Sequence, residues 1–248
     1  MSNYAVYFFV FLVIFAGSFV QGIAGFGSAM VWMSFLPLFI EFKEASALVP
    51  FMLTGIGLQM TLKLYKDINF KTAIVPLAVS IVGTFIGAWI LNFTTTHTMQ
   101  IVLGIFLILV GVYSFATSKN PIQIKATPLN GGIAGMTAGI FTGLLNIGGP
   151  PLGLYYNAAA ESTMEFKANI EFNFLLMYGW AAILKFFNGE VTKGLLQYFV
   201  PGYIGVILGG ILGLYFFSKF DKKKVSYIVW TMLIIMGTFQ LAKAFKLF

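Results

Sequence analysis

Apolar residues occur along this chain in long blocks and not in an alternating pattern. Five stretches contain no Asp, Glu, Lys or Arg: residues 1–40, 72–118, 126–160, 194–218 and 225–242. Each is close to or longer than the ~18–20 apolar residues that span the hydrocarbon of a bilayer. Outer-membrane barrels instead alternate within segments of ~10 residues. The pattern therefore predicts an all-α polytopic membrane protein.

Two of the apolar segments differ from the rest in length. Six have the length of ordinary transmembrane helices: residues 45–62, 72–92, 99–117, 170–187, 195–217 and 225–242. The other two, 4–40 and 129–160, are too long for one helix and contain clusters of Gly and Pro. Because Gly and Pro disfavour a continuous helix, each is either one kinked span or a hairpin of two short helices.

The order of these segments repeats along the chain. An interrupted segment is followed by three plain spans, and the same order then occurs again. We therefore predict a first membrane repeat at residues 1–118, a cytoplasmic linker at 119–128 and a second membrane repeat at 129–248. Such internal duplication is common in transporters.

The distribution of lysines distinguishes hairpins from single kinked spans. The chain has 15 basic residues, all lysines, against 8 acidic residues. With two hairpins, one face collects ten lysines: Lys63, Lys66, Lys71, Lys119, Lys125, Lys167, Lys219, Lys222, Lys223 and Lys224. The other face then has Lys43, Lys193, Lys243 and Lys246. Single crossings would split the lysines roughly eight to six, so the positive-inside rule favours hairpins, with the ten-lysine face cytoplasmic and both termini outside.

A hairpin followed by three crossings gives an odd number of net crossings per repeat. The two repeats are then inverted relative to each other, and their hairpins enter from opposite faces. The sequence thus predicts two inverted repeats whose Gly-rich tips meet near the midplane, where transporters bind substrate on discontinuous helices.

Both tips carry residues suited to binding an anion. The candidates at the first tip are Gln21, Gly22, Gly25, Phe26, Gly27 and Ser28, and those at the second are Asn146, Gly148, Gly149, Pro150 and Pro151. Each second half-helix begins with unpaired N–H groups and a positive dipole end, which together form an anion site. Glycines let a ligand approach the backbone, prolines suit a first helical turn, and Phe26 is placed to gate the path. The alternative is close helix packing at the glycines, with Asn146 as a backbone cap.

The remaining composition argues against other kinds of site. The chain has no Cys and one His, so we expect no metal, no cofactor and no catalytic residue, and the protein is not expected to be an enzyme. Its positive charge is attributed to loops between spans, so no nucleic-acid partner is expected. Four charged residues after the second hairpin, Glu161, Glu165, Lys167 and Glu171, are expected to form a solvated linker, and the alternative is that they feed a proton into a coupled cycle.

Two glycine-rich motifs resemble those of a known family. Residues 22–28 (GIAGFGS) and 139–151 (GIFTGLLNIGGPP) are similar to the signatures of the TauE/SafE sulfite exporter family. Many members carry a Gly triplet at both tips, whereas this chain has GFGS and GGPP. The resemblance implies a secondary transporter of the inner membrane, most commonly an exporter, for sulfite or organosulfonates such as sulfoacetate. The implied partners are this small anion and the lipid bilayer. A homodimer with a second copy of the chain is one of the oligomeric states left open. A passive anion channel and a non-transporting membrane scaffold are the alternatives.

Overall fold

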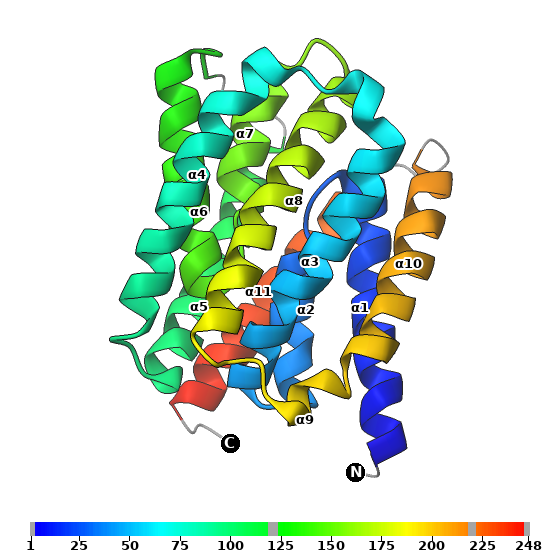
Figure 1. Ribbon diagram of the computed structural model, residues 1–248, viewed down its shortest axis with the longest axis vertical. Coiled ribbons are helices and arrows are strands. Elements are labelled where there is room, and N and C mark those ends of the chain that lie inside the picture. The colour runs from blue at the N-terminus through cyan, green and yellow to red at the C-terminus, as the bar shows by residue number, and fades with distance from the viewer. Residues whose placement is uncertain (1–2, 119–123, 218–221, 246–248) are drawn as a thin grey trace.

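Helices are the only regular secondary structure in the described part of the chain. The computed structural model describes residues 3–118, 124–217 and 222–245. The long helices are α1 (Asn3–Ala24), α3 (Phe42–Leu64), α4 (Phe70–Leu91), α5 (Thr96–Thr117), α6 (Pro128–Leu145), α8 (Thr163–Phe187), α10 (Phe199–Phe216) and α11 (Lys222–Ala244). The short ones are α2 (Ser28–Phe35), α7 (Gly149–Ala159), α9 (Lys193–Leu196) and the 3₁₀ turns η1 (Leu36–Leu38) and η2 (Tyr65–Asp67). Figure 1 shows them as one elongated bundle, in which α1 begins and α11 ends at the same, lower end.

Seven helices in the described ranges are long and apolar enough to cross a membrane: α1, α3, α4, α5, α8, α10 with α9, and α11. The predicted all-helical, multi-spanning character is therefore confirmed for these residues. Several helices extend beyond the predicted spans: α8 begins at Thr163, seven residues before the predicted span 170–187, and α6 begins at Pro128, the last residue of the predicted linker. Residues 119–123 of that linker lie outside the described residues.

Polar side chains mark where the helices begin. In five helices a residue just before the first turn accepts a hydrogen bond from a backbone N–H of that turn, which satisfies one otherwise unpaired donor. These capping residues are Asn69 for α4, Thr95 for α5, Thr127 for α6, Ser162 for α8 and Thr192 for α9. Each of these five helices therefore begins at a polar residue whose side chain closes its first turn.

The two interrupted segments each contain two helices packed antiparallel. In the first, the Trp32 ring nitrogen of α2 donates to the Ile14 carbonyl of α1, 3.0 Å away, and Ser28 reaches back to Gln21. Later residues of α2 therefore contact earlier residues of α1, which shows that the two helices are antiparallel. In the second, a Cβ at Gly131 would be 2.9 Å from the Tyr155 ring, while a Cβ at Gly148, near the turn, would meet the Ala138 carbonyl at 3.0 Å.

Glycines bring the long helices together in pairs. Along the α4–α6 contact, a Cβ on Gly143 would lie 2.4 Å from the Thr84 carbonyl oxygen. Along α1–α10, a Cβ on Gly22 would lie 2.6 Å from the Gly213 Cα. Along α5–α11, a Cβ on Gly237 would lie 2.7 Å from the carbonyl oxygen of Gly104. Glycines thus allow close helix packing at these three crossings, one of which involves Gly22 of the predicted first tip.

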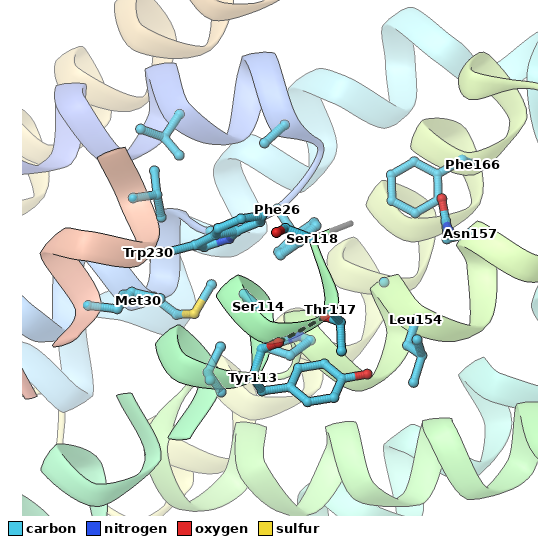
Figure 2. Close-up of a pocket in the computed structure, with 18 residues that line it drawn as sticks. Phe26, Met30, Tyr113, Ser114, Thr117, Ser118, Leu154, Asn157, Phe166 and Trp230 are labelled. Atoms are coloured by element: carbon cyan, nitrogen blue, oxygen red, sulfur yellow. Dashed lines mark hydrogen bonds between the residues drawn. The ribbon is translucent and has the colours of Figure 1, made fainter. Parts of the chain in front are cut away.

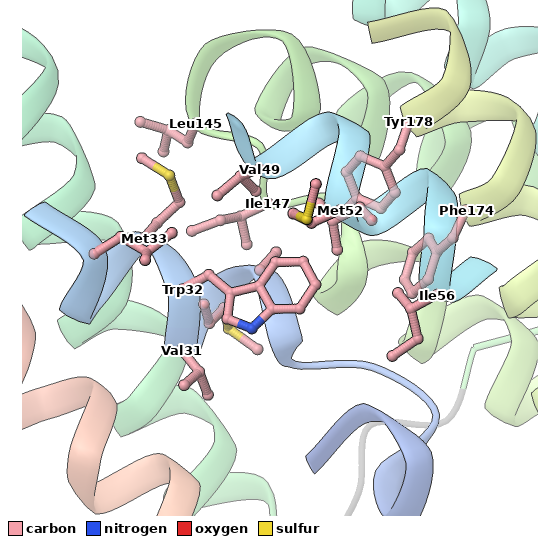
Figure 3. Close-up of a cluster of buried hydrophobic side chains, with 14 of the residues drawn as sticks. Val31, Trp32, Met33, Val49, Met52, Ile56, Leu145, Ile147, Phe174 and Tyr178 are labelled. Atoms are coloured by element: carbon pink, nitrogen blue, oxygen red, sulfur yellow. The ribbon is translucent and has the colours of Figure 1, made fainter. Parts of the chain in front are cut away.

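The densest part of the core surrounds α2. Trp32 is fully buried among side chains of α3, α8 and the turn before α7, including Met52, Phe174 and Ile147 (Figure 3). Large apolar side chains on the outer helices, such as Phe8, Leu109, Ile207 and Ile228, point outward instead. The short helices α2 and α7 and the turns before them are therefore enclosed by protein. Non-helical backbone at membrane depth is tolerated only in such a place or beside a water-filled cavity.

Candidate functional site

The first tip is a turn of three residues between α1 and α2. Gly25 and Gly27 have φ values of +85° and +114°, a region that residues with a Cβ rarely adopt. Gly25 donates its N–H to the Gln21 carbonyl, closing the end of α1, and Gly27 is the N-cap of α2. The first three residues of α2, Ser28, Ala29 and Met30, are buried and line a small cavity.

The second tip has a similar backbone course. Asn146 has φ +61° and is the only non-glycine residue with positive φ in the described ranges. Its N–H donates to Thr142, and its side-chain Nδ2 donates to the Ser46 carbonyl of α3, 3.0 Å away. Gly148 then caps α7, and its N–H donates to the buried Tyr178 hydroxyl at 3.0 Å. The Asn146 amide is therefore already engaged with α3.

The two tips contact each other through Phe26. A Cβ on Gly149 would lie 3.3 Å from Phe26 Cδ2, and one on Gly153 would lie 3.5 Å from Phe26 Cε1. Beside this contact, a small cavity of about 10 Å³ lies between the beginnings of α2 and α7. It has room for about one water molecule. Its lining includes Gln21, Gly27, Ser28 and Gly149 from the predicted set. We call this space the central cavity.

The donors at the two tips are not equal in number. The first turn of α2 carries N–H groups on Ser28, Ala29 and Met30, whereas α7 has Pro150 and Pro151 in its first turn, so that Gly149 alone donates there. Ser28 adds a hydroxyl at the beginning of α2. An anion in the central cavity would therefore receive most of its hydrogen bonds from the first tip.

The helix α8 contributes buried polar residues, two of which were expected in a solvated linker. Lys167 and Glu171 have no exposed surface, so their assignment to a solvated linker is wrong. Lys167 donates to the Gly22 carbonyl, and Glu171 accepts from Gln21 Nε2 at 2.8 Å. Further along, Asn173 donates to the Tyr156 hydroxyl at 3.1 Å. The nearby acids Glu161 and Glu165 indicated a solvated segment. The signal that could have corrected this is the four-residue spacing of Lys167 and Glu171, which places both on one face of a helix that continues into an apolar span.

An open cleft leads toward the first tip from the end where α8 begins. We call it the vestibule; the part beside the beginning of α8 has a volume of about 530 Å³ and includes Lys167 and Glu161 in its lining. The part beside α5 and α11, of about 310 Å³, shares Phe26 and Trp230 with it and is mainly apolar (Figure 2). Phe26 therefore lies between the vestibule and the residues of the central cavity.

A second opening lies at the opposite end of the bundle. This cleft of about 290 Å³ is lined by residues of α3, the α4–α5 turn and the end of α8, among them Lys43, Ser46 and Lys185. Lys185 forms an ion pair with Glu190 at 2.8 Å, and the carbonyl of Ser46 holds Asn146 of the second tip. The two clefts thus approach the tips from opposite ends.

A bundle with seven helices in its described part that are long and apolar enough to cross a membrane is the architecture of a multi-pass membrane protein. The sequence model of the family described as sulfite exporter TauE/SafE matches residues 9–239, and the chain belongs to this family. No curated protein and no solved structure matches the chain. Membership in a family of membrane anion exporters is consistent with a protein that is not an enzyme.

Proposed function

We propose that this protein is a secondary transporter that carries small sulfur-containing anions, such as sulfite or organosulfonates, across the cell inner membrane. We propose export as the direction, in line with its family. The observation that carries the proposal is the central cavity, which the beginnings of α2 and α7 both line. Two helix N-termini at one buried space favour an anion through their N–H groups and dipoles. No permanently charged side chain is needed to hold the anion.

The proposal includes two inverted repeats, residues 1–118 and 129–248, each a hairpin followed by three spans. Equivalent contacts support it: Gly22 meets Gly213 between α1 and α10, and Gly143 meets Gly87 between α6 and α4. The pair Gly25 and Asn146, both with positive φ, occupies the same place before each tip. In each case a feature of the first repeat has a counterpart at the equivalent helices of the second repeat, as expected for two inverted repeats.

Alternating access would then proceed through the two clefts. The central cavity is too small for an oxyanion of several heavy atoms, so the tips must move apart when the substrate binds. Phe26 blocks the vestibule side, and the contacts of Asn146 and Lys185 with Ser46 lie on the other side. We propose that the vestibule end, which carries Lys63, Lys66 and Lys71 of the predicted ten-lysine face, is cytoplasmic.

Flux into proteoliposomes tests the function directly. Purified protein is reconstituted, and uptake of sulfite, thiosulfate, sulfoacetate, sulfate and chloride is measured against empty vesicles. We expect saturable uptake of at least one sulfur-containing anion and competition by the others. Unitary currents in planar bilayers would instead establish a channel. Absence of binding and flux for all five anions would contradict the anion-site proposal.

A further inference from the structure

Glu171 is an acid buried inside a membrane-spanning helix, which is costly and usually functional. Its side chain has no exposed surface, and its Oε2 accepts a hydrogen bond from Gln21 Nε2 at 2.8 Å. Its other oxygen, Oε1, is buried without a hydrogen-bond partner. The carboxyl group therefore retains an oxygen to which a proton can add without breaking an existing bond.

Gln21 connects this acid to the central cavity. Its Oε1 accepts a hydrogen bond from the Ser28 hydroxyl, while its Nε2 donates to Glu171. Both Gln21 and Ser28 line the central cavity. In this arrangement the Ser28 hydrogen is directed to Gln21, so the hydroxyl offers lone pairs to the cavity, and these repel an anion.

We propose that Glu171 is a proton-binding site coupled to the anion site, so that a proton and the anion bind with positive cooperativity. This inference rests on the proposed function. A proton from water in the vestibule adds to a Glu171 oxygen, forming one O–H bond and removing one negative charge. The carboxyl group then rotates so that its new O–H faces Gln21, and the Gln21 amide turns over: its carbonyl accepts from Glu171, and its NH₂ donates to Ser28 Oγ. The Ser28 hydrogen becomes available to the anion.

The charged surroundings of Glu171 suit this role. On α8 itself, Lys167 lies one turn earlier on the same face and lines the vestibule, and Tyr178 lies about two turns later, with its hydroxyl bonded to Gly148. The helices α1, α2, α6 and α7 contain no charged residue, and Tyr156 of α7 is bonded to Asn173. The charged residues of α3, η2 and α4 at this end, which are Lys63, Lys66, Asp67 and Lys71, are exposed. Protonation of Glu171 would thus change the charge next to the first tip.

The experiment measures anion affinity as a function of pH in purified protein by titration calorimetry. Methanesulfonate and thiosulfate serve as probes because both remain ionised between about pH 5 and about pH 8. For the wild type we expect affinity to fall as pH rises, by at most about tenfold per pH unit, the limit for one coupled proton. In weakly buffered solution, binding should also take up protons from the medium.

Glu171→Gln removes the titrating group while keeping its shape and its ability to donate to Gln21 Oε1. We expect its affinity to be independent of pH and close to the low-pH value of the wild type, with no proton uptake. Asp67→Asn, which removes an exposed acid at the same end, should keep the wild-type pH profile. A Glu171→Gln protein that follows the wild-type profile would overturn the proposal.

Ser28→Ala provides a second test that does not depend on the folding of Glu171→Gln. Without the hydroxyl we expect weaker binding at low pH and a flatter pH profile; an unchanged profile would count against the relay. If the wild type binds the probes equally at all pH values, the coupling is wrong and the anion site stands. If it binds neither probe at any pH, both the coupling and the proposed function are contradicted.

Discussion

The ring of Phe26 lies against Gly149, and this contact joins the two tips. A Cβ on Gly149 would be 3.3 Å from Phe26 Cδ2, closer than most side-chain contacts. Phe26 belongs to the turn before α2 and Gly149 is the first residue of α7, so the contact connects residues of the two proposed repeats. It also separates the vestibule from the central cavity.

Gly149→Ala should therefore reduce transport more than it reduces stability. The added methyl group forces Phe26 to shift by a few tenths of an ångström but requires no unusual backbone angle. We expect a loss of anion flux of about tenfold or more, with a change in unfolding free energy of about 1 kcal/mol or less. The control is Gly132→Ala in α6, where a Cβ would meet Val79 no closer than 3.9 Å. Equal flux in both variants would contradict a functional role for the contact.

Phe26→Ala should open the path between the vestibule and the tips. Removing the ring leaves a gap at the Gly149 and Gly153 contacts, so small anions would pass without the normal movement of the tips. We expect a chloride leak in proteoliposomes that the wild type lacks, while Phe26→Leu, which keeps most of the volume, should stay sealed. The measurement is chloride efflux with an ion-selective electrode. A Phe26→Ala protein as tight as the wild type would show that another residue forms the barrier.

Gly143→Ala and Gly213→Ala should both destabilise the protein. In each case the methyl group would meet backbone atoms of the neighbouring helix, at 2.4 Å from the Ala88 nitrogen for Gly143 and at 2.5 Å from the Phe19 carbonyl for Gly213. Overpacking of this kind costs about 1–3 kcal/mol, and backbone cannot move aside as a side chain can. Thermal unfolding in detergent should show lower midpoints for both, with Gly132→Ala unchanged. Similar losses would agree with the proposed equivalence of the α6–α4 and α1–α10 contacts.

Tyr178→Phe should weaken the second tip. The Tyr178 hydroxyl accepts the Gly148 N–H at 3.0 Å in a fully enclosed place, and its removal leaves that donor without this partner. An unsatisfied buried donor costs about 1–3 kcal/mol. We expect a lower unfolding midpoint and weaker anion affinity, both measured on purified protein. A variant as stable as the wild type would mean that water replaces the hydroxyl.

Two substitutions separate the backbone contribution of Asn146 to stability from that of its side chain. Asn146→Gly keeps the positive φ of +61° without strain and removes the bond to Ser46, whereas Asn146→Ala removes the bond and adds strain of about 1–2 kcal/mol. We expect Asn146→Gly to be the more stable of the two by thermal unfolding. If the two variants are equally stable, the left-handed conformation contributes little to the fold.

Some residues of the site were predictable because their signal is local. The glycines of both tips interrupt segments that are otherwise too long and apolar, and the prolines after Gly149 occur where a new helix can begin. Glu171 could not be assigned in the same way. Its partner Gln21 is 150 residues away, and the adjacent acids Glu161 and Glu165 gave its segment the composition of a surface linker.

The sequence by itself determined that this chain is a helical membrane protein of the TauE/SafE family, because the length of apolar runs and the spacing of glycines are local properties. It also located the two interruptions. Only the tertiary structure decided that Phe26 contacts Gly149, and that the charged residues at the beginning of α8 face the first tip. Those contacts depend on which helix faces pack together, and packing between distant segments cannot be read from the composition of either one.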